Sequence, residues 1–230
     1  QEWSGRSEAP GRRGSMTDKL LDIIRSKYPL VELDVGEYDT LKANGMRFCV
    51  KAYRADGLGH VSVMRAKGFF GLMKMDTLMI VPKEKDLPLY SYDRIYAMGN
   101  DTLIVELYDT LTETLDLSLL DEIKSRFAYL SERDPGEHWY DHLKLPQSIS
   151  KKGKKAETQN FDDLAIEHFD AYLSASASDT SDEAKKRELS FRYVNGLLTQ
   201  GGPSTDVFKK SLGEEKTEKL FKNVLFGVDA

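Results

Sequence analysis

The spacing of apolar positions changes twice along the chain. Near the N-terminus they recur at three- to four-residue steps, which predicts a short amphipathic helix with Thr17 as its N-cap and Pro29 beyond its end. From Met46 to residue 109, apolar and polar positions alternate between turn residues, which predicts five or six strands in an antiparallel meander. After residue 116 the spacing becomes helical again.

The second half of the chain predicts helices and polar connections. Helical spacing covers residues 116–134, 161–176, 183–200 and 204–226, with Gly-Gly-Pro separating the last two. Residues 148–159 are polar and basic, which predicts a loop. Strands followed by helices indicate an α+β fold in a single domain, with an antiparallel sheet covered by helices.

Composition narrows the functional classes. The chain has 230 residues, of which 40% are hydrophobic and 31% charged, and its formal net charge of −5 gives no indication of nucleic-acid binding. A single cysteine, Cys49, excludes an intramolecular disulfide and favours the cytoplasm, or the plastid stroma in a eukaryote. No apolar run approaches the length of a membrane span, so we expect no membrane partner.

The first fifteen residues, "QEWSGRSEAPGRRGS", differ from the rest. They are rich in Gly, Ser and Arg, contain no apolar signal-peptide segment and precede Met16. We interpret residues 1–15 as the remnant of an expression tag and expect the folded domain to cover residues 16–230.

Two segments resemble the ferredoxin-dependent bilin reductases. "DLPLYSYD", residues 86–93, is similar to the "LPLFGxD" segment of that family. "VFKKSLGEEKTEKLFKNVLFGV", residues 207–228, is similar to its closing pattern "VLxKAFGxxWxxxYxxxVLFD". The family includes the enzymes that form phycocyanobilin, phycoerythrobilin and phytochromobilin.

The resemblance implies a fold, a substrate and an electron donor. The fold is an α/β/α sandwich that holds a linear tetrapyrrole such as biliverdin between its sheet and its C-terminal helices. Members bind no flavin, metal or nicotinamide, and electrons arrive one at a time from a reduced [2Fe–2S] ferredoxin. The sequence contains no GxGxxG after a strand, no P-loop, no CxxC and no HExxH, in agreement with these absences.

Asp93 is the principal candidate for catalysis. The resemblance implies that this aspartate faces the tetrapyrrole and supplies a proton to it. Independently of the family, a carboxyl between Tyr90, Tyr92 and Tyr96 on an apolar sheet face would lose water, which raises its pKa toward neutrality. The alternative is that Asp93 points to solvent on a polar strand face.

A second catalytic position lies on the preceding strand. The histidine found there in phycocyanobilin-forming members aligns with Thr77 or with Asp76, so one of the two is expected opposite Asp93. Two carboxylates on one face would raise one pKa further. Alternatively, Asp76 pairs with Lys74 or Arg94 at the surface.

Substrate contacts are predicted at four positions. Tyr90 flanks the candidate acid, and Thr102 aligns with a family serine that contacts a propionate, although threonine is also common in strands for its β-propensity. Gly201 and Gly202 stand where the family has an Asn-Asp pair. A family glutamate, expected near Met64 or Arg65, is also missing. With fewer proton donors, we expect a two-electron product.

The densest basic run is a candidate partner site. Lys151, Lys152, Lys154 and Lys155 would form a docking patch for an acidic ferredoxin, because electron-transfer encounters are small and steered by charge. The alternative is a solvated loop.

The histidine pair His138 and His142 has helical i, i+4 spacing. However, Pro135 and Gly136 favour a loop there and no third ligand is evident, so we expect no metal site.

The resemblance and the candidate residues together predict a monomeric bilin reductase. The alternatives are a reductase of another linear tetrapyrrole catabolite and a bilin- or haem-binding protein without activity.

Overall fold

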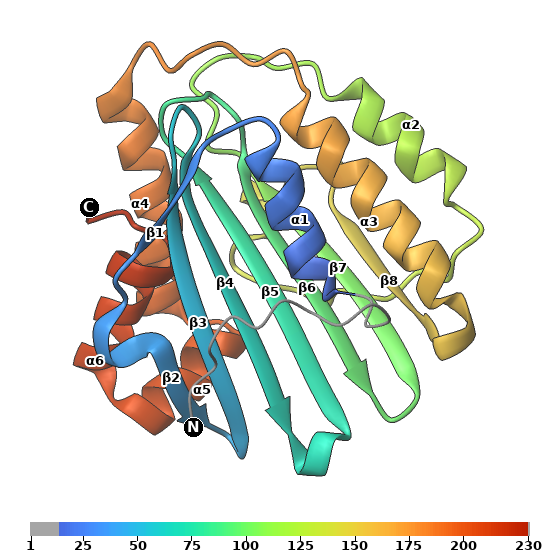
Figure 1. Ribbon diagram of the computed structural model, residues 1–230. Helices are drawn as coiled ribbons and strands as arrows, with labels where there is room; N and C mark the ends of the chain where they lie inside the picture. The colour runs from blue at the N-terminus through green and yellow to red at the C-terminus, as the bar shows by residue number, and fades with distance from the viewer. Residues whose placement is uncertain (1–13, 230) are drawn as a thin grey trace.

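An antiparallel eight-stranded sheet forms the centre of the protein, and the computed structural model describes residues 14–229 of the chain (Figure 1). The strand order is β1-β3-β4-β5-β6-β7-β8, and β2 also pairs with β3. The strands are β1 (Leu30–Leu33), β2 (Thr40–Ala43), β3 (Met46–Ala55), β4 (Gly59–Gly68), β5 (Met73–Pro82), β6 (Leu89–Ala97), β7 (Asn100–Tyr108) and β8 (Ile149–Lys154).

Helices cover both faces of the sheet. One face carries α1 (Met16–Arg25), α2 (Ser118–Arg126) and α3 (Thr158–Leu173). The other carries α4 (Glu183–Gln200), α5 (Pro203–Leu212), α6 (Glu214–Lys219) and a π-helical turn (Leu220–Leu225). We call them the α1–α3 face and the α4–α6 face. This arrangement confirms the predicted α+β sandwich.

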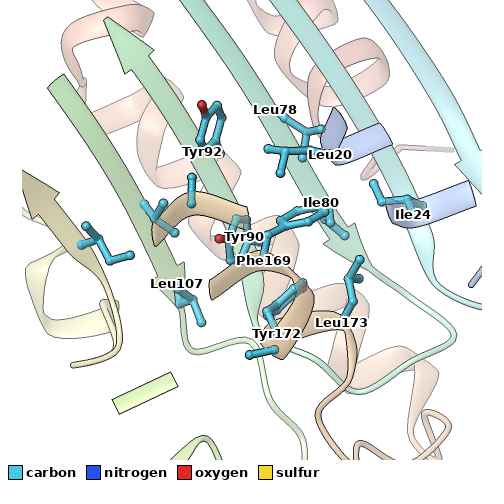
Figure 2. Packing of buried hydrophobic residues seen from close by; sticks show 14 of the residues in the cluster. Leu20, Ile24, Leu78, Ile80, Tyr90, Tyr92, Leu107, Phe169, Tyr172 and Leu173 are labelled. Carbon is cyan, nitrogen blue, oxygen red and sulfur yellow. The ribbon is translucent and has the colours of Figure 1, made fainter. Parts of the chain in front are cut away.

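Each face has its own apolar core, because successive side chains of a strand point to opposite sides. On the α1–α3 face, even-numbered residues of β5 and β6 point toward the helices: Tyr90 packs against Phe169 and Tyr172 of α3, and Leu78 lies beside Leu20 of α1 (Figure 2). The α4–α6 face contains a second cluster, built on side chains that include Phe48, Met79, Leu89, Tyr108, Tyr193 and Phe208. Odd-numbered residues of β5 and β6 therefore belong to the α4–α6 face.

The N-terminal boundary differs from the prediction. Ser15, rather than Thr17, caps α1, since its Oγ accepts a hydrogen bond from the backbone N–H of Asp18 at 3.2 Å. Thr17 is buried instead, and its Oγ1 accepts a hydrogen bond from Arg65 Nε at 3.0 Å. Ser15 thus belongs to the folded part, whereas the rest of the predicted tag up to residue 13 lies outside the described residues.

Three strands were not predicted. β1 and β2 are only four residues long, and the run predicted as a basic loop forms β8, which pairs with β7 from Val105↔Ile149 to Asn100↔Lys154. Short and highly charged segments carry little periodicity, and here the edge of an existing sheet organises them. No described helix combines the length and the apolar character needed to cross a membrane.

Candidate active site on the α4–α6 face

Asp93 lies in the middle of β6 on the α4–α6 face. Its partners in register are Thr77 on β5 and Ile104 on β7. The residues around it on this face, Ser91, Ile95 and Ile104, are half-buried, as is Asp93 itself. The prediction that Asp93 faces a sheet side covered by C-terminal helices agrees with this geometry, and the side chain keeps partial access to solvent.

The surroundings of Asp93 favour its protonated form. Thr77 Oγ1 donates a hydrogen bond to Asp93 Oδ1 at 2.5 Å, which by itself stabilises the carboxylate. Desolvation by the sheet and its cover is the larger effect, and the negative charge of Glu106 adds to it, so the pKa of Asp93 rises to about 6. A carboxyl group with this pKa can release a proton near neutral pH.

Glu106 is a site residue that the sequence analysis missed. It lies on β7 opposite Ser91, on the same face as Asp93, and Lys144 Nζ is 3.5 Å from its Oε2. Lys144 Nζ is also 3.4 Å from Asp141 Oδ1. These ion pairs connect the interior of the site to the segment after residue 138. Glu106 and Thr102 are four residues apart on β7, so strand alternation places them on the same face of the sheet. This alternation was the feature of the sequence from which Glu106 could have been predicted as a neighbour of Asp93.

Tyrosines border the polar group. The rings of Tyr108 on β7 and Tyr193 on α4 stack with centroids 4.1 Å apart, and Tyr140 meets Tyr108 edge-on at 5.6 Å. Burial raises the pKa of Tyr140, and Glu106 contributes to the same shift. The phenol groups of Tyr108, Tyr140 and Tyr193 therefore remain neutral, and their rings form an aromatic border to the polar group around Asp93 and Glu106.

Asp76 is not brought together with Asp93. It pairs in register with Arg65 and Arg94, so its side chain lies on the α1–α3 face. Burial raises its pKa, with the Arg65 charge opposing the shift. Of the two positions considered opposite Asp93, the structure therefore selects Thr77.

Tyr90 is also on the other face. It is fully buried among Phe169 and Tyr172 (Figure 2), and its hydroxyl lies 3.0 Å from His168 Nδ1. His168 Nε2 donates to the carbonyl of Gln147 at 2.9 Å, so Nδ1 is the acceptor and Tyr90 the donor. Tyr90 contributes to the core and not to the Asp93 site.

The other predicted substrate contacts lie nearer. Thr102 is on the α4–α6 face of β7, opposite Ile95, and is buried. Gly201 ends α4 and its carbonyl accepts a hydrogen bond from Trp139 Nε1 at 2.8 Å. Trp139 in turn packs edge-on against Tyr140, with centroids 5.3 Å apart. Gly202 is the N-cap position of α5. The two glycines thus approach the site through Trp139 and Tyr140.

The four predicted docking lysines have two different environments. Lys151 is buried and donates to the carbonyl of Leu130 at 2.9 Å and to Glu132 at 2.5 Å, so it is a structural residue. Lys152, Lys154 and Lys155 are exposed. Strand alternation separates Lys151 from Lys152 and Lys154 on β8, and Lys155 lies in the turn that follows the strand. The three exposed lysines remain a candidate patch.

The histidine pair is divided between different partners. His138 Nδ1 lies 3.6 Å from Asp141, and His142 Nδ1 interacts with the carbonyl of Trp139 at 2.8 Å. Within residues 14–229 there is no group of three His, Cys, Asp or Glu side chains able to hold a metal ion.

Two open surface hollows lie away from Asp93. One of about 690 Å³ is lined mainly by residues 109–118 and 145–147, and one of about 520 Å³ by residues around β1 and the following turn. Neither includes Asp93, Thr77 or Glu106. The titratable side chains that line the two hollows, such as Asp109, Asp121 and Asp34, are all exposed to solvent, so the half-buried carboxyl of Asp93 is the better candidate for catalysis.

No protein-family model and no curated protein sequence matches the chain. Among solved structures, phytochromobilin synthase from tomato in complex with biliverdin has the same fold, with a TM-score of 0.71 over 93% of this chain and 83% of that chain. The two sequences are 13% identical. This likeness confirms the fold implied by the resemblance to bilin reductases, while the roles of individual residues rest on the geometry of this chain.

Proposed function

We propose that the protein binds a linear tetrapyrrole on the α4–α6 face and reduces it, with Asp93 as a proton donor. The observation that carries the proposal is a half-buried carboxyl with a pKa of about 6 under the C-terminal helices. The shared fold with a protein that holds biliverdin supports the choice of substrate class. Fold alone would not, because one fold hosts many functions.

The proposed reaction adds two electrons and two protons to one double bond of the substrate. Two reduced ferredoxins supply the electrons one at a time and are themselves oxidised. Asp93 transfers one proton to the substrate after each electron, and between the two transfers it regains a proton from solvent, which its partial exposure permits. Thr77 holds the resulting carboxylate through its hydroxyl, and the Glu106–Lys144–Asp141 ion pairs offer a path for a proton from the surface.

The exposed lysines of β8 and the following turn are the proposed ferredoxin contact. Lys152, Lys154 and Lys155 keep this role, whereas Lys151 does not because its ammonium group is buried and paired. Replacing the three exposed lysines by Ser raises the KM for ferredoxin at low ionic strength. The difference fades toward physiological salt, where the Debye length is about 8 Å.

Anaerobic turnover of biliverdin with reduced ferredoxin, followed by absorption and chromatography, tests the proposal. The expected product is a two-electron reduced bilin. Asp93→Asn keeps biliverdin binding but lowers the turnover rate by about 100-fold or more, in the range of general acid catalysis. Asp76→Asn, on the opposite face, is the matched control and keeps the wild-type rate. Wild-type turnover by Asp93→Asn would remove Asp93 from the mechanism.

A second candidate is a bilin- or haem-binding protein without reductase activity. It is favoured by the absence of a second carboxyl in direct contact with Asp93, whose one hydrogen-bond partner among the described side chains is Thr77. Binding of biliverdin with no spectral bleaching under reduced ferredoxin would select this candidate. Bleaching by a different linear tetrapyrrole, and not by biliverdin, would select a reductase of another catabolite.

A further inference from the structure

Exposed apolar side chains gather at one end of the sheet. At the β4–β5 connection Phe70 is 109% exposed, Leu72 is 72% and Phe69 is 53%, and at the β6–β7 turn Met98 is 90% exposed. Both connections leave the sheet at the same end, the lower one in Figure 1, because Gly68, Met73, Ala97 and Asn100 pair in one continuous register. We call Phe69, Phe70, Leu72 and Met98 the apolar tips.

Three of the apolar tips occupy backbone conformations that disfavour them. Phe69, Phe70 and Met98 have φ values of 51°, 56° and 51°, in the left-handed region where side chains other than Asn, Asp and Gly are strained. The β2–β3 turn has the same conformation and uses Asn44 and Gly45, the residues that such a turn prefers. Since the tips are exposed, burial does not offset their strain, and folding does not explain why they are large and apolar.

A row of four cations crosses the sheet beside the tips. Lys42 pairs in register with Arg47, Arg47 with Lys67, and Lys67 with Lys74. All four are exposed on the α1–α3 face, and none forms an ion pair with any described residue. Like charges directly opposite each other on paired strands are destabilising. We call these residues the cation row.

Two acids on this side, Asp76 and Asp18, form no ion pair with the cation row, although Lys67 is close enough for its charge to act on Asp76. Asp76 is half-buried two positions further along β5, and Asp18 is engaged by Arg65. The row therefore presents a concentrated positive charge on a protein whose net charge is −5. An anionic partner would relieve the repulsion among the four side chains.

We propose that the apolar tips and the cation row form a docking surface for an anionic lipid membrane. The tips enter the boundary between headgroups and acyl chains, and the cations contact acidic headgroups. This proposal goes beyond the proposed reduction and does not depend on it. It also revises the expectation of no membrane partner, because residues scattered from position 42 to position 98 form this surface only in the folded sheet.

The shape of the surface selects lipid over a protein partner. The apolar side chains project from two separate connections, two strands apart, with no described residue covering Phe70. A protein partner would need matching holes at that spacing to bury them. A lipid interface accepts projecting apolar side chains without shape complementarity, and adsorption strengthens with each buried apolar group and each nearby cation.

Sedimentation with phosphatidylcholine vesicles, with and without phosphatidylserine, tests the proposal. The wild-type protein binds the phosphatidylserine vesicles and less to phosphatidylcholine alone. Phe69→Asn/Phe70→Asn lowers this binding by about tenfold or more, since asparagine tolerates the left-handed conformation but adds no apolar area. Lys67→Glu/Lys74→Glu lowers it by about 25-fold or more.

A matched charge reversal provides the control. Lys185→Glu/Arg187→Glu changes the net charge equally on exposed residues of α4, which begins at the opposite end of the molecule, and leaves vesicle binding unchanged. The Phe70→Trp variant adds a reporter at the tip, and its emission shifts to the blue on the anionic vesicles. Absence of wild-type binding at low salt, or binding without this shift, overturns the proposal.

Two further outcomes would assign the surface to another occupant. If Phe69→Asn/Phe70→Asn abolishes a self-association seen by light scattering while no vesicle binding occurs, the surface joins two copies of the chain. If that variant raises the KM for ferredoxin without any vesicle binding, the surface is a protein dock. Either result overturns the lipid proposal.

Discussion

Asp93 and Arg94 are neighbours on β6, and their side chains lie on opposite faces of the sheet. Arg94 on the α1–α3 face is fully buried, with its Nε 2.5 Å and its Nη2 2.7 Å from the two carboxylate oxygens of Asp101. A second carboxylate, that of Asp162, is 2.9 Å from Nη1. Asp93 on the α4–α6 face has a hydroxyl as its direct partner and an anion, Glu106, as its charged neighbour.

The difference separates a structural polar group from one suited to chemistry. The carboxylates around Arg94 compensate its charge, so the α1–α3 face keeps a permanent ion pair. The surroundings of Asp93 oppose its charge, and its pKa lies where the proton is exchangeable near neutrality. We therefore expect polar groups on the α1–α3 face to matter for stability, and those on the α4–α6 face to matter for activity.

Breaking the Arg94 ion pair should produce the largest change in stability. Arg94→Leu leaves the buried carboxylate of Asp101 uncompensated, and we expect the free energy of unfolding in urea to fall by about 3–5 kcal/mol. Arg94→Leu/Asp101→Leu should recover part of this loss because no buried charge remains. A single-variant loss below about 1 kcal/mol would mean that water or rearrangement satisfies Asp101.

Asp93→Asn should stabilise the protein as it removes activity. Because the folded-state pKa of Asp93 is raised to about 6, the folded state holds this proton more tightly than the unfolded state. Wild-type stability from this group is highest at low pH and falls as pH rises from about 4 to about 6. The variant lacks this fall and should be more stable by about 1–3 kcal/mol above pH 6.

Urea denaturation at several pH values measures this difference. The gain should vanish near about pH 3, where Asp93 is protonated in both the folded and the unfolded state. A gain that is constant from pH 4 to pH 8 would show that the effect is packing and not ionisation. Glu106→Gln should also lower the pKa of Asp93, since one opposing negative charge is removed.

Tyr90→Phe distinguishes the two faces at smaller cost. Removing the hydroxyl leaves His168 Nδ1 buried without a donor, and we expect a loss of about 1–2 kcal/mol in unfolding free energy. Because Tyr90 lies on the α1–α3 face, away from Asp93, the Kd and the absorption spectrum of bound biliverdin should stay those of the wild type. A shifted spectrum would return Tyr90 to the substrate site predicted from the sequence.

Gly202→Asp should have the smallest effect. The φ of Gly202 is 176°, which any residue adopts, and an added Cβ would meet Leu197 at 3.4 Å, an ordinary contact. At the N-cap of α5, the new carboxylate should accept hydrogen bonds from backbone N–H groups of the first helical turn. We expect this to raise the free energy of unfolding by roughly a few tenths of a kcal/mol. The pKa of the new carboxyl would fall there, so the variant should still yield the two-electron product; a four-electron product would contradict this.

Local sequence determined the elements with strong periodicity. Alternation between Met46 and Tyr108 placed the central strands, and apolar spacing placed α3 and α4, because each pattern must bury one face. The same alternation, with the resemblance, was enough to name Asp93 as the candidate proton donor, a role that stays a prediction. It could not locate β1, β2 and β8, whose short or charged segments gain their conformation from the sheet edge they pair with.

Register decided what the sequence left open. The choice between Thr77 and Asp76 depends on a shift of one residue, which exchanges the faces of a strand, and only the pairing of β5 with β6 fixes it. Pairing across the sheet likewise brought Glu106 beside Asp93, buried Lys151, and aligned Lys42, Arg47, Lys67 and Lys74. The sequence specifies which side chains are present, but only the folded sheet determines which of them are neighbours. The reason is that contacts between residues distant along the chain determine how far each side chain is desolvated and which charges act on it.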